Sequence, residues 1–237
     1  MAVLISAIIP AYNEADVIAD TVRAALGIPG VAQLIVVDDG STDGTAEAAR
    51  SAGAHQVVVL ERNLGKGGAL NRALPHAKGD VLLLLDADLG TSAREASKLL
   101  EPVLSGEADM AVALLGGAAV AERSGPSKLA PRSRGFGLVV KTARLGIRVL
   151  AGRWVTAPLA GPRALRREIV EKAGGFAPRF GVEVGLTIDA LRMGYRVVEV
   201  PVGMVHRPSG RDLKGFRHRG RQMVDVLRTI GRKAVQL

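Results

Sequence analysis

Apolar runs alternate with helical patterns through the first half of the chain. Runs of consecutive apolar residues occupy 4–9, 34–37, 56–60 and 81–85. Helices are predicted over 14–26, where Val17, Ile18, Val22 and Leu26 have helical spacing, over 42–51, and from the glycine-rich loop 63–68 to 77. Strands and helices that alternate at this spacing predict an α/β fold: a doubly wound, mostly parallel sheet with helices on both faces.

The pattern is looser after residue 88. Helices are predicted over 93–104, 138–150, 163–173 and 182–193, and strands over 109–114 and 196–200. The segment 124–137, with two prolines and three glycines, predicts a mobile loop. Met223, Leu227 and Ile230 have helical spacing in the C-terminal tail. No internal repeat is visible.

The run 81–85 is the most apolar of the predicted strands, and two carboxylates follow it. Asp86 and Asp88 are separated by Ala87, and Gly90 closes the segment. A continuous apolar run is typical of a strand buried on both faces, and open α/β sheets bind ligands at the carboxyl ends of their strands. Carboxylates at this place can bind a divalent cation, which in turn can hold a diphosphate. A solvated pair that merely ends a strand is the alternative.

Two other predicted strands also end in polar clusters. Asn13 and Glu14 follow the first strand, and Asp38 and Asp39 follow the second. Because parallel strands end at one edge of the sheet, these clusters and the Asp86–Asp88 pair should line one crevice. Three clusters at one edge favour a binding site over chance.

The composition narrows the choice of function. Aromatic residues make up only 3% of the chain, which argues against nucleic-acid folds that stack bases. No cysteine is present, so thiol nucleophiles, disulfides and cysteine metal sites are excluded. The N-terminal apolar run has no basic region before it, which argues against a signal peptide. The run 110–121 is too short to cross a bilayer. We expect a cytoplasmic protein.

The net charge of +9 is unevenly distributed. The segment 123–153 holds eight Lys and Arg and no acid, and the segment 206–237 holds nine against two Asp. Basic segments suit partners that carry phosphate: a nucleotide, an anionic lipid surface or nucleic acid. Nucleic acid would be repelled by the acidic strand ends. Lys141, Arg144 and Arg148 share one face of the predicted helix 138–150, which suits peripheral contact with the inner membrane face, although a solvated surface helix has the same pattern.

The order of these motifs resembles a known family. Pro10-Ala11-Tyr12-Asn13-Glu14, then Val37-Asp38-Asp39-Gly40-Ser41, then Asp86-Ala87-Asp88, is similar to glycosyltransferase family 2, whose members have the Rossmann-like GT-A fold. The resemblance covers residues 4–115 closely and continues more loosely to about 210. It implies a transferase that uses a nucleotide-sugar donor, with a nucleotide-binding half over 1–115, an acceptor-binding half of the same domain over 116–210 and a basic tail over 211–237.

The resemblance also implies roles for residues of the donor site. The segment Pro10-Ala11-Tyr12 would bind the nucleotide, with Tyr12 against the nucleobase and Asp39 accepting a hydrogen bond from the base. Glu14 would help to hold the nucleotide. Asp86 would face the ribose and sugar, and Asp88 would ligate Mg²⁺ or Mn²⁺, because a diphosphate approaches carboxylates only with a cation between them.

Further candidates come from the glycine loop and the C-terminal half. Lys66, at the start of a predicted helix, suits a phosphate, although the loop is not a Walker A motif. Glu183 is similar to the family's acid near the acceptor and is a candidate general base, with Asp189 as a weaker one. His206 would complete the metal shell. Arg207 and Arg211, with Arg217 and Arg219, would clamp the departing diphosphate in a loop over 206–221 that closes on it.

The acceptor is left open by the sequence. Polyprenyl-phosphate glycosyltransferases and glucosyl-phosphoglycerate synthases are both similar at these motifs, so we expect a UDP-sugar such as UDP-glucose and a phosphorylated acceptor, either a lipid phosphate or a small metabolite. Family members mostly invert the anomeric configuration, and we expect inversion here. The synthases retain it, and retention would argue against Glu183 as the general base. The sequence also leaves open whether the chain forms a homodimer.

Two other classes of function stay open at this stage. A sugar-1-phosphate nucleotidyltransferase also has acids at its strand ends, but normally a basic glycine-rich loop follows its first strand, where this chain has Ala11 to Glu14. A non-enzymatic basic module that binds membrane or nucleic acid would use the two basic segments and leave the acidic strand ends unexplained.

Overall fold

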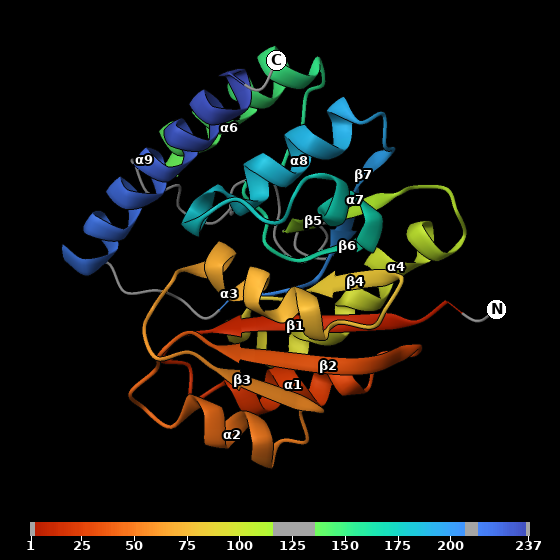
Figure 1. The fold of residues 1–237 in the computed structure, drawn as a ribbon, viewed down its shortest axis with the longest axis vertical. Helices are drawn as coiled ribbons and strands as arrows, with labels where there is room; N and C mark the ends of the chain where they lie inside the picture. Colours follow the sequence, from red (N-terminus) through yellow and green to blue (C-terminus); the bar gives the residue numbers. More distant parts are fainter. Residues whose placement is uncertain (1–2, 116–135, 207–212, 236–237) are drawn as a thin grey trace, which may run out of the picture.

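A seven-stranded sheet forms the centre of the computed structural model, which describes residues 3–115, 136–206 and 213–235 (Figure 1). The strands are β1 (Ile5–Ala11), β2 (Val31–Asp38), β3 (Gln56–Val59), β4 (Val81–Leu84), β5 (Met110–Leu115), β6 (Arg163–Arg166) and β7 (Val197–Val202). Their order across the sheet is β3-β2-β1-β4-β6-β5-β7. All neighbouring pairs are parallel except those that β6 forms with β4 and β5, so the predicted mostly parallel sheet is confirmed.

Helices cover both faces of this sheet, as the alternation of patterns predicts. One face carries α1 (Ile18–Leu26), α2 (Thr45–Ser51), the 3₁₀ segment η2 (Ala87–Ala96) and α4 (Ser97–Leu104). The other carries α3 (Lys66–Ala73), which continues into η1 (Leu74–His76), together with α7 (Arg167–Lys172) and α8 (Val182–Arg192), which follows η3 (Arg179–Gly181). Each face has its own core of buried aliphatic side chains, because alternate residues of a strand point to opposite faces.

A further layer lies outside α8. The helices α6 (Phe136–Ala151) and α9 (Leu213–Val235) run side by side at the outer edge of the molecule (Figure 1). A third cluster of buried side chains joins them to α8: Val139, Ala143, Ile147, Val155, Val184, Ile188 and Val226. The predicted helix over 138–150 is therefore confirmed, and its buried face packs on α8 and α9.

The helix predicted over 163–173 is wrong in its first part. Residues Arg163–Arg166 form β6, which inserts antiparallel between β4 and β5, and α7 begins only at Arg167. Ala164, Leu165, Ile169 and Val170 are buried and have a spacing that a helix would also give, so the local pattern does not separate the two structures. The pairing with two neighbouring strands decides it.

The prediction for the tail is also partly wrong. We expected a loop over 206–221, but α9 begins at Leu213 and continues to Val235, through Gly215 and Gly220. The helix rests on α6, α8 and η3, and such packing outweighs the unfavourable helix propensity of glycine. Arg207 and Arg211, and most of the loop predicted over 124–137, lie outside the described residues.

Candidate active site

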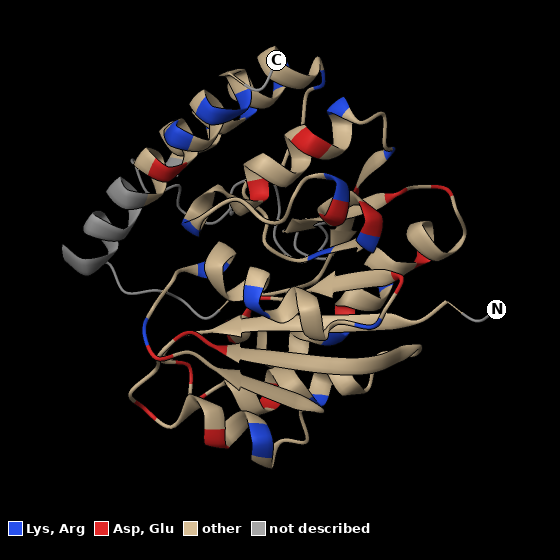
Figure 2. Ribbon diagram, viewed as in Figure 1, with Lys and Arg blue, Asp and Glu red and all other residues tan. Residues whose placement is uncertain are grey.

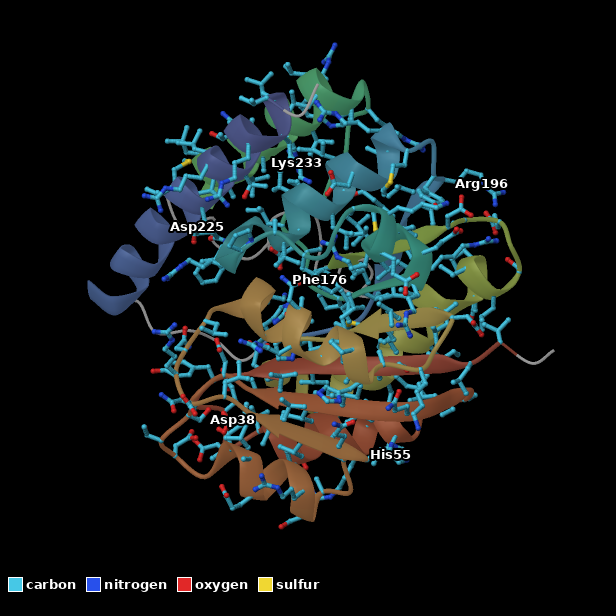
Figure 3. The ribbon with its side chains drawn as sticks, in the orientation of Figure 1. Asp38, His55, Phe176, Arg196, Asp225 and Lys233 are labelled. Carbon is cyan, nitrogen blue, oxygen red and sulfur yellow. The ribbon has the colours of Figure 1, made fainter. Side chains whose placement is uncertain are left out.

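The polar segments that follow β1 and β2 are held together by hydrogen bonds. The backbone N–H of Asp39 donates to the carbonyl of Ala11 at 2.8 Å. The backbone N–H of Asn13 donates to the hydroxyl of Ser41 at 2.9 Å, and the Asn13 side chain accepts from the N–H of Thr42 at 3.0 Å. Asp38, which ends β2, marks this carboxyl edge of the sheet in Figure 3. The shared edge predicted from the sequence is thus present.

Asp39 fixes the glycine-rich loop that precedes α3. Its carboxylate is buried and accepts the backbone N–H groups of Leu64 at 2.7 Å and Gly65 at 2.8 Å. Gly65 has φ of +78°, a left-handed value that favours glycine. Burial raises the pKa of Asp39 above its ordinary value, although the two N–H groups lower it. A buried acid therefore sets the turn that starts α3.

Lys66, the first residue of α3, joins the two halves of the chain. Its Nζ lies 2.5 Å from Oδ1 of Asp86, after β4, and 2.8 Å from Oε1 of Glu183, in the first turn of α8. Gly67 makes this approach possible, because a Cβ there would collide with the main-chain carbonyl of Ala177 just before α8. Lys66, Asp86 and Glu183, all predicted site residues, thus form one cluster.

The electrostatics of this cluster keep its lysine charged. Burial alone would lower the pKa of Lys66, but the carboxylates of Asp86 and Glu183 outweigh it and the pKa is raised. Burial would likewise raise the pKa of Asp86, but the Lys66 ammonium holds that pKa below its ordinary value. A cation flanked by two carboxylates can exchange one of them for an oxygen of an anionic ligand.

Asp88 and His206 form a second pair next to this cluster. Nδ1 of His206 lies 2.9 Å from Oδ1 of Asp88, and its Nε2 lies 3.8 Å from Oδ2 of Asp86. The hydrogen bond with Asp88 is the main cause that raises the pKa of His206 above its ordinary value. The structure therefore brings together the two metal ligands predicted from positions 118 residues apart.

Asp88 and His206 can provide part of a coordination shell for a divalent cation. Within the described part of the chain, no group of three or more His, Asp and Glu side chains could hold a metal ion by itself. Mg²⁺ is usually bound through one or two carboxylates, with substrate phosphates and water completing the shell. Asp88 and His206 fit a cation of that kind, which a diphosphate would complete.

Arg163 is the site residue that the sequence analysis missed. It is the largest fully buried side chain among the described residues, and its guanidinium donates to the carbonyls of Ala160 at 2.5 Å and of Gly161 and Glu183 at 3.3 Å each. Burial lowers its pKa. Arginine is rarely buried, and no local pattern around Arg163 marks it, so a sequence offers no signal for this position.

Gly161 is a second residue that the sequence did not mark. A Cβ on Gly161 would lie 2.6 Å from Nζ of Lys66 and against both carboxylate oxygens of Asp86. The backbone of this segment thus forms one wall of the charged cluster, and only glycine leaves room for the Lys66–Asp86 pair. Arg163 holds that wall and the start of α8 through the three carbonyls.

The other predicted residues lie at the same carboxyl edge of the sheet or outside the described part of the chain. Pro10 and Ala11 end β1 and pair with Val37 and Asp38. Tyr12 is 48% exposed at the end of β1, and the backbone N–H of Glu14 donates to the hydroxyl of Thr45 at 2.9 Å. Arg207 and Arg211 are not among the described residues.

Comparison with known proteins defines the class. The model of the family "Glycosyl transferase family 2" matches residues 6–173, well over half of the chain. The chain belongs to glycosyltransferase family 2, as its motifs led us to expect. This membership sets it apart from sugar-1-phosphate nucleotidyltransferases.

Individual relatives are about one third identical to this chain in sequence over the aligned residues. The chain is 31% identical to glycosyltransferase AglJ of Haloferax volcanii over 86% of its own length and 63% of that protein's. It is 31% identical to glucosyl-3-phosphoglycerate synthase of Mycolicibacterium paratuberculosis, over 94% of its own length and 71% of the synthase's. The chain is also similar to an undecaprenyl-phosphate 4-deoxy-4-formamido-L-arabinose transferase of Klebsiella pneumoniae. This match is shorter: the sequences are 38% identical over 41% of this chain and 32% of the relative.

Solved structures give the same picture for the fold. The chain is similar to glucosyl-3-phosphoglycerate synthase of Mycobacterium tuberculosis, with a TM-score of 0.76 and 31% identity over 97% of this chain and 81% of the synthase. Another structure of that synthase, with a TM-score of 0.73, 31% identity and coverage of 97% and 80%, holds Mn²⁺, UDP-glucose and phosphoglyceric acid. The expected GT-A fold is therefore confirmed.

Proposed function

We propose that this protein transfers a sugar from a UDP-sugar, such as UDP-glucose, to a phosphorylated acceptor with the help of Mg²⁺ or Mn²⁺. One observation carries the proposal: Lys66 bridges Asp86 and Glu183 at 2.5 and 2.8 Å, beside the Asp88–His206 pair. A cation, a candidate metal pair and two carboxylates at one sheet edge suit a sugar diphosphate, which offers anionic oxygens and hydroxyl groups together.

On the donor side, each residue has a role that its position supports. Tyr12, exposed after β1, offers its ring to the nucleobase, and Asp39 would accept from a base N–H. Asp86 would accept from ribose and sugar hydroxyls, and Lys66 would contact the diphosphate. We further propose that Pro10, Ala11 and Glu14 shape the nucleotide subsite and that Arg207 and Arg211 bind the diphosphate, which makes 1–115 the nucleotide half and 116–210 the acceptor half of one domain.

Asp88 and His206 are the residues that would hold the cation. When bound, the cation would neutralise charge on the diphosphate and so stabilise the leaving UDP. Lys66 adds a second positive charge on a group whose position α3 and the Asp39 hydrogen bonds fix in advance. Preorganised charge of this kind stabilises the transition state without reorganisation of the site.

The acceptor is proposed to be phosphorylated because of the relatives. A solved synthase similar to this chain binds phosphoglyceric acid, and the name of another relative gives undecaprenyl phosphate as its substrate. The basic segments 123–153 and 206–237 suit a phosphate group on either kind of acceptor.

We propose a single in-line displacement that inverts the anomeric carbon. The acceptor oxygen forms a bond to that carbon as the bond to the diphosphate oxygen breaks, and UDP leaves with the electron pair. An acceptor hydroxyl would give its proton to Glu183, which lies on α8, opposite the donor-side Asp86 across Lys66. A phosphate acceptor is already a nucleophile and needs no base.

The experiment is a transfer assay on a panel of nucleotide sugars, with Mn²⁺, with Mg²⁺ and with EDTA. We expect hydrolysis or transfer with a UDP-sugar that requires the cation and is nearly abolished in Asp88→Asn, with Asp20→Asn, an exposed carboxylate on α1, as the matched control. Full activity in EDTA or in Asp88→Asn would refute the metal assignment. NMR of the product anomer tests inversion, and a retained configuration would remove Glu183 as the base.

A further inference from the structure

Exposed apolar side chains gather on the outer layer formed by α6 and α9. Thirteen large hydrophobic side chains are exposed in the described part of the chain. Seven of them belong to these two helices and the turn after α6: Leu138, Leu145, Val149, Trp154, Val224, Leu227 and Val235. Clusters of exposed apolar side chains, unlike single ones, mark surfaces that bind a partner or a membrane.

On α6 these side chains form one stripe with cations beside it. Leu138, Leu145 and Val149 are spaced by seven and four residues, which places them on one line of a helix, and they are 62%, 60% and 71% exposed. Lys141 and Arg148 are also exposed and occupy the adjacent line. The opposite face of α6 is buried against α8 and α9.

On α9 the described part has a similar arrangement. Val224, Leu227 and Val235 are 44%, 51% and 88% exposed, and the exposed Arg228 and Arg232 follow them around the helix. Both helices therefore offer an aliphatic stripe bordered by cations.

The two helices are held in a fixed relation, so their stripes form one surface. Gly146 of α6 packs so closely on Ile230 of α9 that a Cβ on Gly146 would collide with it. Arg192, at the end of α8, donates to the carbonyl of Leu150 at 2.8 Å and to that of Lys233 at 2.6 Å. We call the exposed side of α6, α9 and Trp154 the outer surface.

The charges of the outer surface are all positive among the described side chains. Lys141, Arg144, Arg148, Arg153, Arg228 and Arg232 are at least partly exposed, and Figure 2 shows Lys and Arg along α9. Nearby acids do not offset them: Asp225 of α9 is buried, and Asp189 of the neighbouring α8 pairs with Lys233 at 2.7 Å. The guanidinium groups of Arg144 and Arg148 each lie 5.9 Å from the ring centre of Trp154, which is 55% exposed.

We propose that the outer surface docks on an anionic phospholipid bilayer. Cations beside a stripe of aliphatic side chains and a tryptophan match the interface of such a bilayer, where headgroups are negative and the layer beneath them is apolar. A second copy of the chain is a poorer partner, because its own cations would face these cations. Nucleic acid would leave the aliphatic stripe without a counterpart. Among the described residues, no helix is long and apolar enough to cross a bilayer.

This proposal goes beyond the proposed function and is tested separately from it. Trp154 is the single tryptophan of the chain and lies on the outer surface, so its fluorescence reports docking directly. The full chain would be mixed with vesicles of phosphatidylcholine alone or with added phosphatidylglycerol, and bound protein measured by sedimentation. We expect binding and a blue shift of the emission with phosphatidylglycerol, weakened by salt, and neither with phosphatidylcholine alone.

Two pairs of variants separate the apolar and the charged contributions. Leu145→Ser with Val149→Ser should weaken vesicle binding and remove the blue shift, whereas Val59→Ser with Leu104→Ser, exposed aliphatic residues elsewhere, should not. Arg148→Glu with Arg228→Glu should lower the partition onto anionic vesicles by roughly tenfold or more. Arg50→Glu with Arg72→Glu, cations on α2 and α3, is the matched control.

Several results would overturn the docking proposal. Absence of wild-type binding to anionic vesicles would do so, as would equal binding of the surface and control variants. A dimer that Leu145→Ser with Val149→Ser converts to a monomer would assign the outer surface to a second copy. Calorimetry with UDP keeps the proposals apart, because all these variants should bind UDP as the wild type does, and a wild type that binds vesicles but not UDP would refute only the proposed function.

Discussion

Lys66 and Asp86 form an ion pair, with 2.5 Å between Nζ and Oδ1, at the point where the N-terminal and C-terminal halves of the chain meet. The side chains are only 18% and 20% exposed, so solvent screens the pair weakly. The same ammonium group reaches Glu183, and no other lysine or arginine of the described chain pairs with either carboxylate. Lys66 therefore supplies the ammonium group that both carboxylates contact.

The first prediction concerns this lysine. Lys66→Met should leave two poorly hydrated carboxylates without their cation and cost about 1–3 kcal/mol of stability. It should also lower transfer by about 10²-fold or more, because a preorganised charge next to the diphosphate is lost. Denaturant unfolding and the transfer assay measure the two effects. Lys78→Met, at an exposed lysine outside the site, is the control, and equal behaviour of the two variants would contradict the assigned role.

The second prediction separates two roles of Asp39. Its carboxylate accepts the N–H groups of Leu64 and Gly65, and the family resemblance implies a bond to the base as well. Asp39→Asn should weaken UDP binding by roughly 1–3 kcal/mol, since the two N–H groups bond to different carboxylate oxygens and the amide replaces one of those oxygens with an NH₂ donor. Calorimetry with uridine and with UDP distinguishes the roles. Weaker binding of both ligands indicates a contact with the base, whereas weaker binding of UDP alone indicates an effect through the Lys66 loop.

The control for this experiment is Asp38→Asn. Asp38 is equally buried, and its carboxylate accepts only the backbone N–H of Ser41, at 3.1 Å, among the hydrogen bonds of the described residues. If Asp39→Asn binds uridine and UDP as the wild type does, then Asp39 contributes to nucleotide binding neither through the base nor through the Lys66 loop.

Much of the fold is visible in the sequence because its signals are local. The apolar runs mark β1 to β5, and the alternation with helices implies that the strands end at one edge, so the Asp39, Asp86 and Asp88 positions follow. Local pattern cannot place β6, because its apolar residues continue into α7 with a spacing that a helix shares. The sheet position between β4 and β5 is decided by pairing partners far away in the chain.

The missing parts of the site have the same cause. Lys66 and Glu183 each lie in a recognisable motif, but no residue near either of them in the sequence indicates that the two side chains are in contact. Arg163 and Gly161 carry no motif at all, since their importance lies in the backbone and charges that surround them in space. Close approach of a glycine and burial of an arginine are properties of the folded chain.

The third prediction is a pH dependence of stability away from the site. Asp109, just before β5, accepts the backbone N–H of Arg196 at 2.8 Å and pairs with Arg196 and Arg166, each at 3.3 Å. Arg196, labelled in Figure 3, directly precedes β7. Burial would raise the pKa of Asp109, but these partners outweigh it and hold that pKa below 3.8. A depressed carboxyl pKa stabilises the fold above 3.8, and this contribution is lost as the pH falls through the folded value.

Asp109→Asn tests this dependence. At neutral pH it should cost about 1 kcal/mol, a modest value because both arginine partners are largely exposed. The difference from the wild type should shrink below pH 3.8, which urea unfolding at several pH values measures. Asp20→Asn removes an exposed carboxylate that pairs with Arg23 and should change stability little at any pH. A difference that stays constant with pH would show that charge is not the cause.

The fourth prediction is that Arg163 positions the cluster of Lys66, Asp86 and Glu183 through the backbone. Its guanidinium donates to the carbonyls of Ala160, Gly161 and Glu183, and an ammonium group cannot reproduce the planar fork. Arg163→Lys should keep a buried cation and fold, with UDP affinity near that of the wild type, but kcat should fall about tenfold or more because the α8 end that carries Glu183 is no longer fixed. Arg163→Met should be more severe and destabilise the fold, since the buried carbonyls lose their donor.

A second substitution keeps this prediction testable if the Arg163 variants fold poorly. Gly161→Ala adds a methyl group against Lys66 and Asp86 and does not change the guanidinium of Arg163. It should also lower kcat, with little change in the melting temperature. Gly231→Ala on α9, where a Cβ meets nothing within 4 Å, should leave kcat unchanged and stabilise the helix by about 1 kcal/mol. If Gly161→Ala and Arg163→Lys lose stability and activity in proportion, the segment is only structural. A fall in kcat of both variants at unchanged melting temperature would show instead that the wall next to Lys66 sets the geometry of the reaction.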